Sequence, residues 1–542
     1  MAEKLDAMGG KLEKAAGGAL MVVCIGIFCA LTFYSARYTV AENGAIPLDT
    51  KDNTGWNLLG LAGVTTAAIL VHRIAKSKYL QVIRQCVRKR KPYLIGMVSI
   101  YVYVVSAMWV SACHVIPYGD SGVLFSIARK MLGGYYIDME SPGCYMTVFP
   151  HQFSLVAVIQ VIMALFGSEN YKAFQYLNAL CMPLLFYSGY KILQYICEDL
   201  ETVFYYILFF LGCFPLFLYV PFVYGEIISI TFTMVLMWQV VRYCKTDRDP
   251  PFRKFRHSAR SAVNGTFLWG TLAIVLACMV RKNSLIVLVA AGIVLLFHSV
   301  RKADPRGVIW ILVMALAVSG SDKLVCTYYE KMSGTEVSGG IPYISWIRMG
   351  LQDTWAGPGW FDNSSVDHFA ENGFDTDRTA LAEKRLLRET LEDMWADKAG
   401  SVDFFRRKIL SQWNSPGYHY GQTTKNFDCG PEEFPAFVRY VYFEGEKTVQ
   451  AYMDRYQFVF YFYVAVSAVA LFADRKKKYC LADLLLYIAM VGGFLFSIMW
   501  EACSRYVLPY IVYMIPMAAL GMHRLVEFLD RFGSARRNKR TA

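Results

Sequence analysis

Long apolar runs constrain this sequence more than any other feature. About a dozen runs of roughly 16–22 residues occur along the 542-residue chain, and runs of that length match the hydrocarbon thickness of a bilayer. A soluble protein of this size has no need of so many. We therefore expect an all-α, polytopic membrane protein with about twelve transmembrane helices, at about residues 19–38, 55–72, 93–113, 172–192, 203–220, 227–242, 265–280, 284–300, 307–325, 456–473, 480–499 and 506–523.

Basic residues mark one side of the membrane. The segment Arg73–Lys91 carries eight Lys or Arg and no acid, and the segments 242–260, 301–306 and 474–478 are basic too. Cytoplasmic loops are enriched in Lys and Arg. We therefore expect a multi-pass membrane protein whose N- and C-termini are cytoplasmic, and the lack of a eukaryotic retention signal together with an outward-facing acidic insert favours the plasma membrane. The net charge of +12 then reflects topology, and no nucleic-acid partner is expected.

The segment 114–167 differs from an ordinary connecting loop. Within it, the apolar residues of 123–132 fall on one helical face and the polar ones on the other, which is the spacing of a helix along a membrane surface. A second helix is predicted from Pro150 to Gly167. If that second helix crossed the membrane, the basic segment 242–260 would lie outside. The positive-inside bias therefore favours two juxtamembrane helices that do not cross.

The expected domain plan has four parts. Residues 1–91 form an N-terminal two-span extension, and residues 92–325 form the transmembrane core. Residues 326–455 form a small, soluble, mainly helical extracytoplasmic insert, in which Thr376–Lys398 has the caps and periodicity of a helix. Residues 456–542 add the last three spans and a basic cytoplasmic tail.

The 14 cysteines are scattered, mostly inside the predicted spans, and show no spacing typical of a metal site. Cys326 and Cys429 share the hydrophilic insert. They could form a disulfide or remain as two thiols, and the sequence leaves both readings open.

Ionisable residues at the outer ends of predicted spans are the best guide to a site. Arg281 and Arg505 break the positive-inside pattern, and Glu226 and Glu501 lie at equivalent depth. Such groups are costly in a membrane unless they pair or line a wet cavity. Together with Asp120 they suit a phosphate-bearing ligand, because arginine binds phosphate bidentately and a carboxylate can take a hydroxyl proton. The alternative is that the arginines contact lipid headgroups or pair structurally with the two glutamates.

Asp120 stands at the head of the predicted surface helix, after Tyr118 and a glycine. An aspartate there is a preferred N-cap, and a cap would also fix the position of a catalytic carboxylate. His151 follows the proline that opens the second helix, so it is either a substrate contact or a capping residue. Tyr118 and Gln152 complete the candidate substrate-binding residues.

These motifs resemble the GT-C glycosyltransferases, the superfamily of protein O-mannosyltransferases and of bacterial aminoarabinose and lipid-linked sugar transferases. The matching segments are Tyr118–Tyr136, Tyr145–Gly167 and Trp500–Tyr510. The resemblance implies transfer of a sugar from a polyprenyl-phosphate donor to a hydroxyl group, at an active site on the outer face of the membrane. The acceptor would be a glycan, glycolipid or protein of the cell wall or cell-surface polysaccharide, and membrane lipid would surround the enzyme.

The resemblance also implies roles for single residues. Asp120 would be the base that deprotonates the acceptor, with inversion at the anomeric carbon. Arg281 and Arg505 would hold the leaving phosphate. Glu226 matches the acidic position where metal-using members place a ligand. Because Asp120 stands alone rather than in a double-acid motif, no metal site or cofactor is expected, and a divalent ion is possible but not favoured.

Three other classes remain as alternatives. An O-antigen-ligase or polymerase type of enzyme would use residues of the long insert, such as Arg406 and His419. A transporter would be expected to show inverted repeats or a matched pair of broken helices, and neither is evident. A non-catalytic scaffold is the third. The tryptophans of the insert would either pack within it or stack on sugar rings.

Overall fold

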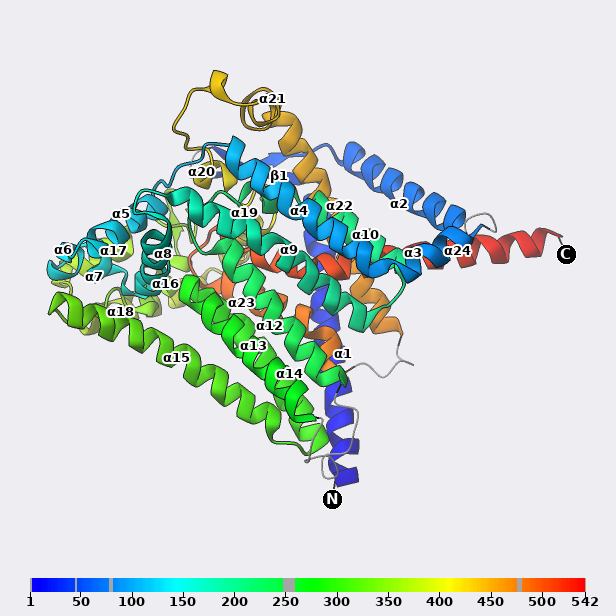
Figure 1. Cartoon of the computed structure of the whole chain (residues 1–542), viewed down its shortest axis with the longest axis horizontal. Coiled ribbons are helices and arrows are strands. Elements are labelled where there is room, and N and C mark those ends of the chain that lie inside the picture. The colour runs from blue at the N-terminus through cyan, green and yellow to red at the C-terminus, as the bar shows by residue number, and fades with distance from the viewer. Residues whose placement is uncertain (1, 44–45, 78–80, 247–258, 475–479, 542) are drawn as a thin grey trace.

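The computed structural model describes residues 2–43, 46–77, 81–246, 259–474 and 480–541, and long helices dominate it (Figure 1). The longer helices are α1 (Ala2–Ser35), α2 (Thr54–Lys76), α4 (Lys91–Ala112), α9 (Tyr171–Ile196), α10 (Leu200–Gly212), α12 (Glu226–Thr246), α13 (Ala259–Val280), α14 (Leu285–Lys302), α15 (Arg306–Ser333), α22 (Glu446–Ala473), α23 (Leu485–Met499) and α24 (Leu508–Thr541). The expected all-α architecture is confirmed.

Every predicted span overlaps a helix, and the span 203–220 overlaps two. Among the described residues, nine helical stretches are long and apolar enough to cross a membrane, and α8 (Phe153–Phe166) with α9 makes up to ten. Two further apolar helices, Leu200–Gly212 and Gly265–Val280, are shorter. The chain is therefore an integral, multi-pass membrane protein, while the number twelve stays a prediction.

The predicted span 203–220 is not one continuous helix. Helix α10 ends at Gly212, and the short helix α11 (Phe214–Leu218) begins just after it with Pro215 at its first turn. Proline lacks the backbone N–H that a continuing helix would need, so it interrupts the span. The hydropathy of the sequence did not reveal this break, because the helices on both sides of it are apolar.

The two expected surface helices are present in the segment 114–167. They are α5 (Asp120–Leu132) and α8, which pack against each other, and Gln160 Nε2 donates a hydrogen bond to Ala128 O at 3.1 Å. Pro150 opens the 3-10 turn that leads into α8, and Gly167 ends it with φ +103°. Helix α9 then departs at 107°. A sharp bend of this kind fits a helix that does not continue across the bilayer.

The insert is mainly helical, as expected. It contains α16 (Tyr343–Gly350), α17 (Ser364–Glu371), α18 (Thr376–Ala396), α19 (Lys398–Trp413) and the two-residue strands β3 (Asp353–Thr354) and β4 (Gly357–Pro358). Helix α15 runs on to Ser333, where Gly334 ends it in the left-handed region, so Cys326 belongs to that helix. The hairpin β1 (Tyr38–Asn43) and β2 (Ile46–Lys51) contacts the insert, because Asn414 Nδ2 donates to Tyr38 O at 2.7 Å.

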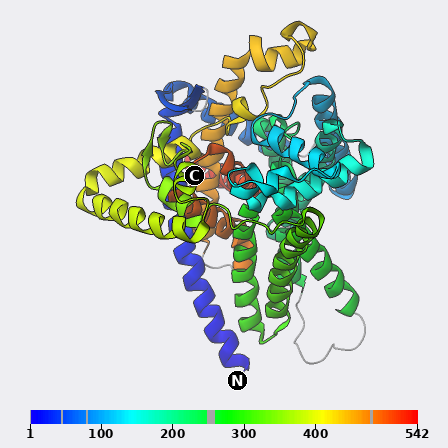
Figure 2. The same cartoon turned by 90° about the vertical axis from the view of Figure 1, so that its left-hand side faces the viewer.

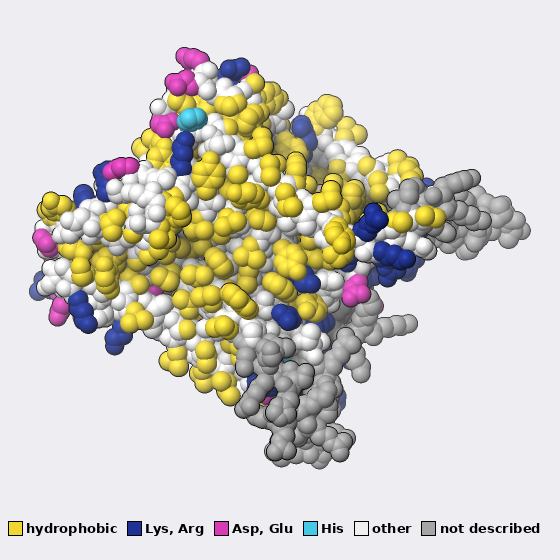
Figure 3. All heavy atoms as spheres, viewed as in Figure 1, with side chains coloured by type: hydrophobic (Ala, Val, Ile, Leu, Met, Phe, Trp, Pro, Cys, Tyr) yellow, Lys and Arg dark blue, Asp and Glu magenta, His cyan; other side chains and the backbone are white. Residues whose placement is uncertain are grey.

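The insert and the surface helices share one end of the molecule. Figure 1 places α5, α8, α17 and α18 at the left, whereas the C-terminal end of α24 points away to the right. Figure 2 looks onto that left-hand end and shows α18 and α19 on one side and the helices of 114–167 on the other. In Figure 3, hydrophobic side chains cover the middle of the face over the long helices, and charged side chains gather towards its edges. That distribution is typical of a surface in contact with lipid.

Candidate active site

A cavity of about 520 Å³ opens at this end of the molecule, between the surface helices and the insert. Its lining includes residues from six separate parts of the chain, at 118–121, 145–152, 222–224, 278–283, 343–423 and 500–506. The cavity brings together seven of the eight residues proposed from the sequence: Tyr118, Asp120, His151, Gln152, Arg281, Glu501 and Arg505. The eighth, Glu226, lies directly behind the two arginines.

Asp120 is the first residue of α5 and does not cap it. The residue before the helix is Gly119, with φ +57° and no side-chain capping bond. Ser121 makes the hydrogen bonds of this turn instead. Its hydroxyl accepts from Tyr118 N at 3.0 Å and donates to Tyr118 O at 2.9 Å. The interpretation of Asp120 as an N-cap is therefore wrong. Its exposed carboxylate faces the cavity.

The two arginines share one buried acid. Glu226 begins α12 with only 2% of its surface exposed, and its Oε1 lies 3.1 Å from Arg281 Nη1 and 3.5 Å from Arg505 Nε. Both guanidinium groups also lie over the ring of Tyr224, at 5.4 and 5.2 Å from its centroid. Two cations against one carboxylate leave a net positive charge at the cavity wall. The two arginines therefore both pair with Glu226 and line the cavity.

The glycine before Glu226 makes this pairing possible. A Cβ at Gly225 would lie 2.4 Å from the carbonyl oxygen of Val280, next to Arg281. Only glycine lets the start of α12 approach the end of α13 so closely. The sequence Tyr-Gly-Glu therefore has a steric reason as well as an electrostatic one.

Glu501 is the second carboxylate of the cavity. The Tyr506 hydroxyl lies 3.4–3.5 Å from its two carboxylate oxygens. Burial raises the pKa of Glu501 to about 7, against the opposing effect of Arg505, and the charge of Asp120 adds to the rise. Glu501 can therefore hold a proton near neutral pH.

His151 and Gln152 follow Pro150 and line the cavity. Gln152 Nε2 donates to the Tyr224 hydroxyl at 2.7 Å, which ties the surface helices to the turn before α12. The His151 ring is accessible from the cavity but lies deep in the protein. Its depth and the charges of Lys282 and Arg281 lower its pKa to about 4. His151 is therefore a neutral hydrogen-bonding group at pH 7.

The insert supplies an aromatic wall that sequence reasoning did not place. Trp346 stacks on Trp500 and on Phe361, with ring centroids 6.4 and 6.3 Å apart. Trp346, Trp360 and Trp413 are buried, so the packing interpretation holds for them. Trp355 differs, because it is 66% exposed at the turn between β3 and β4 and faces the cavity.

A buried lysine connects the insert to the transmembrane core by hydrogen bonds. Lys408 Nζ donates to the carbonyl oxygens of Ile498 at 2.9 Å and Trp500 at 2.7 Å, and also to that of Gly350. Two of these carbonyls belong to the C-terminal end of α23, where helix carbonyls otherwise lack partners. The contact fixes the position of Trp500 and of the neighbouring Glu501.

The cavity does not suit a divalent ion held by Glu226. That carboxylate already lies between two guanidinium groups, which repel a cation. Within the described ranges, two groups of side chains have metal-like spacing, His114–Asp428–Cys429 and Asp199–Glu201–His523, and neither includes a cavity carboxylate. Metal independence of the reaction stays a prediction.

The structure answers two questions that the sequence left open, on the two insert cysteines and on the two residues that a ligase would use. Cys326 and Cys429 are both free thiols. Of the two insert residues that a ligase would use, His419 lines the cavity, while Arg406 pairs with Asp403 at 2.7 Å on the exposed face of α19.

Two solved structures are similar to this chain. One is the archaeal oligosaccharyltransferase AglB from Archaeoglobus fulgidus in complex with an inhibitory peptide and a dolichol-phosphate, with 13% identity and a TM-score of 0.40, over 83% of this chain and 52% of that one. The other is ArnT from Cupriavidus metallidurans bound to undecaprenyl phosphate, with 15% identity and a TM-score of 0.39, over 80% of this chain and 60% of that one.

The chain thus spans between half and three fifths of the length of these proteins. Because both TM-scores lie below 0.5, the function proposed below rests on the residues of the cavity. No curated protein matches this sequence.

A family model covers nearly all of the chain. It matches residues 17–526, from within α1 to within α24. The chain belongs to the family described as conserved hypothetical integral membrane protein.

Proposed function

We propose that this protein is a membrane glycosyltransferase that moves a sugar from a polyprenyl-phosphate donor to a hydroxyl acceptor. The observation that carries the proposal is the pairing of two features on one cavity. An aspartate with no capping role faces the same space as two arginines that share a single carboxylate. A base and a phosphate clamp are the two parts that such a transfer needs.

The arginines form the phosphate half. The buried Arg505 Nε makes no hydrogen bond in the described structure, although it lies near Glu226. A phosphate oxygen of the donor would supply the acceptor that this N–H lacks. The lipid phosphate leaves as an anion, so it needs no proton, and two guanidinium groups stabilise its charge as the bond to the sugar breaks.

Asp120 forms the acceptor half. Its carboxylate takes the proton of the acceptor hydroxyl while the hydroxyl oxygen attacks the anomeric carbon from the face opposite the phosphate. The new glycosidic bond forms as the bond to the phosphate oxygen breaks, and the anomeric configuration inverts. Glu501, which holds a proton near neutral pH, and neutral His151 are assigned to binding sugar hydroxyls.

The proposed site faces the extracytoplasmic side. It lies at the end of the molecule away from the end of α24, and the basic segments predicted to be cytoplasmic support that orientation (Figure 1). The acceptor would then be a glycan, glycolipid or protein outside the cytoplasm.

The test uses protein purified in detergent and a panel of radiolabelled polyprenyl-phosphate sugars. Wild type is expected to consume one carrier, and Asp120→Asn is expected to bind that carrier without consuming it. Asp138→Asn is the matched control, because Asp138 lies in the same outer segment but pairs with Lys130 away from the cavity. Equal consumption by wild type and Asp120→Asn would exclude Asp120 as the base. Failure of wild type to bind any carrier would exclude the function itself.

One observation keeps an O-antigen-ligase type of enzyme as the second candidate. His419 lines the cavity with a left-handed backbone at φ +68°, and its ring lies 5.8 Å from that of Trp360. For such an enzyme, His419→Ala would abolish turnover and Asp120→Asn would not. The proposed transferase predicts the opposite pattern.

A further inference from the structure

Two segments far apart in the sequence run side by side at the outer end of α4. Residue Val115 forms an antiparallel bridge with Phe427 of the insert. Ile116 N donates to Asn426 O at 3.0 Å, and Asp428 N donates to His114 O at 3.3 Å. This backbone pairing holds the side chains of His114, Asp428 and the following Cys429 next to one another.

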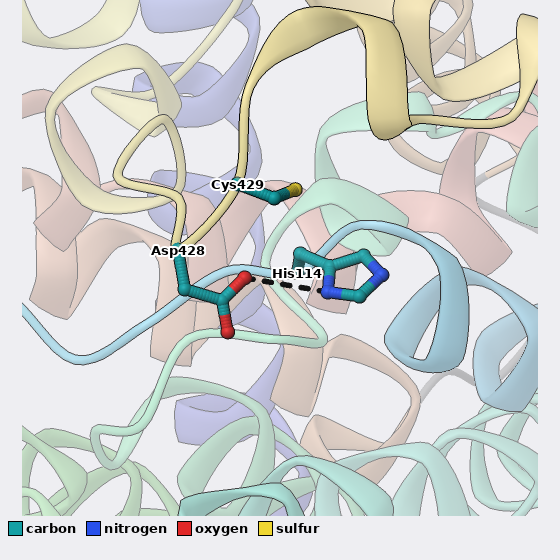
Figure 4. A group of neighbouring side chains, drawn as sticks. All are labelled: His114, Asp428 and Cys429. Carbon is teal, nitrogen blue, oxygen red and sulfur yellow. Dashed lines mark ion pairs between the residues drawn. The ribbon is translucent and has the colours of Figure 1, made fainter.

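Figure 4 shows these three side chains around a common space. Their ligand atoms, one from each residue, all lie within 4.8 Å of one another, and His114 Nδ1 is 3.3 Å from Asp428 Oδ1. A thiol, an imidazole and a carboxylate are the donors that zinc takes in proteins, at bond lengths of about 2.0–2.3 Å. We propose that His114, Asp428 and Cys429 bind a Zn²⁺ ion.

Neighbouring residues orient the three side chains, which supports a metal site. The Tyr171 hydroxyl donates to Asp428 Oδ2 at 3.1 Å, which orients the carboxylate from outside. The His114 ring packs edge-on against Phe434, with centroids 6.1 Å apart. Gly430 N donates to Glu433 Oε1 at 3.3 Å, so a further carboxylate lies in the same turn. A water molecule or Glu433 would complete a tetrahedral set.

The side chains are also open enough for an ion to enter. The side chains of His114 and Asp428 are 36% and 40% exposed, and one ligand atom of each of the three residues lies within 4.8 Å of the others. Sequence analysis did not find this group, because its histidine and its cysteine belong to different parts of the chain and no local spacing connects them.

The other group with metal-like spacing is less suited to a cation. Its Glu201 and Asp199 lie 3.6 and 3.9 Å from the Arg84 guanidinium group, and His72 already contacts Glu201. The charges of these carboxylates are thus offset by cations of the protein itself. Asp428 pairs with His114, and that histidine is itself a ligand in the proposed site.

A bound ion would fasten the insert to the start of the first outer segment, just before Asp120 in the chain. The site does not depend on the proposed transferase activity. Its test therefore measures metal binding alone.

The experiment removes metal from the purified full-length protein with a chelator and titrates it with Zn²⁺ by calorimetry. Co²⁺ is the second probe, because a thiolate bound to Co²⁺ gives a charge-transfer absorption that nitrogen and oxygen ligands do not. Wild type is expected to bind one Zn²⁺ and to show this absorption. Cys429→Ser is expected to lose the absorption and to bind Zn²⁺ at least about tenfold more weakly, and Tyr171→Phe to weaken binding by roughly 10–100-fold.

Two controls make the result specific. Cys326→Ser removes a thiol elsewhere, and Glu201→Gln disrupts the other group, so both are expected to keep wild-type binding. Elution in detergent shows that each variant is folded. Retention of the Co²⁺ absorption by Cys429→Ser would overturn the proposal, as would equal Zn²⁺ affinity of wild type and this variant.

Discussion

Two buried glutamates show how differently one residue type can be used. Glu226 starts α12 and Glu201 lies in the first turn of α10, and each pairs with side chains from distant helices. Glu226 contacts two arginines that line an open cavity. Glu201 contacts His72, His523 and Arg84, and it does not line the cavity that Asp120 faces.

The two glutamates differ in the net charge of the groups around them and in whether those groups face an open cavity. Around Glu226, the positive charge exceeds the negative and faces an opening large enough for a ligand. Around Glu201, the further acids Asp530 and Glu527 balance the basic groups, and the network holds α2, α10 and α24 together. A buried acid by itself therefore indicates either a site or a structural joint.

The largest effect on turnover is expected from Asp120, the proposed general base. Asp120→Asn should lower turnover by about 100–10,000-fold, which is the usual contribution of general base catalysis. The carboxylate faces the cavity and caps no helix, so the unfolding temperature should stay close to that of wild type. Asp530→Asn in the Glu201 network is the matched control, and it should retain turnover. Similar turnover losses in both variants would contradict the distinction between the two regions.

Removing the acid of the closed network should act on stability instead. Glu201→Gln removes the carboxylate that contacts the buried His72 and His523, which keep only their longer contacts with Asp530 and Glu527, and it should lower the free energy of unfolding by about 1.5–3 kcal/mol. Denaturant titration in detergent measures this loss. Turnover per folded molecule should not change. A turnover defect in the folded fraction would show that this network also serves the reaction.

The phosphate clamp should respond through affinity. Arg505→Gln removes one of two guanidinium groups, so the polyprenyl-phosphate carrier should bind about 10–100-fold more weakly, or about 1.4–2.8 kcal/mol. Arg281 still pairs with Glu226, which limits the structural damage. Calorimetry with the carrier phosphate and Arg505→Lys as an intermediate variant provides the comparison. Unchanged affinity in Arg505→Gln would remove the arginines from the proposed site.

The smallest effect concerns pH. The pKa of Glu501 rises from 4.5 to about 7 on folding, so the folded protein holds the additional proton between these pH values. The free energy of unfolding should therefore fall as pH rises through this window. Glu501→Gln carries no titrating group and should flatten that dependence in thermal unfolding experiments. An unchanged slope would mean that another group dominates.

Much of the architecture could be predicted because hydropathy and charge bias are local signals. The spans, the surface helices closed by Gly167, and the cavity positions of Arg281 and Arg505 follow from them. The break before Pro215 was missed because both flanking helices are apolar. The capping role of Asp120 was wrong because its neighbour Ser121 already satisfies the turn.

Contacts across long sequence distances could not be predicted. The stacking of Trp346 on Trp500 and the carbonyl contacts of Lys408 depend on how the insert folds back onto α23. The same is true of His114 beside Cys429. No periodicity or spacing in a single sequence indicates that such residues meet.

The stereochemistry of transfer tests the central claim most directly, because it reports whether one displacement occurs between Asp120 and the arginine clamp. The anomeric configuration of the product can be determined by NMR with the carrier that wild type consumes. A single displacement with Asp120 as base predicts inversion relative to the donor. Retention would exclude a single displacement from the face opposite the phosphate and would contradict the assignment of Asp120 as the base for that displacement.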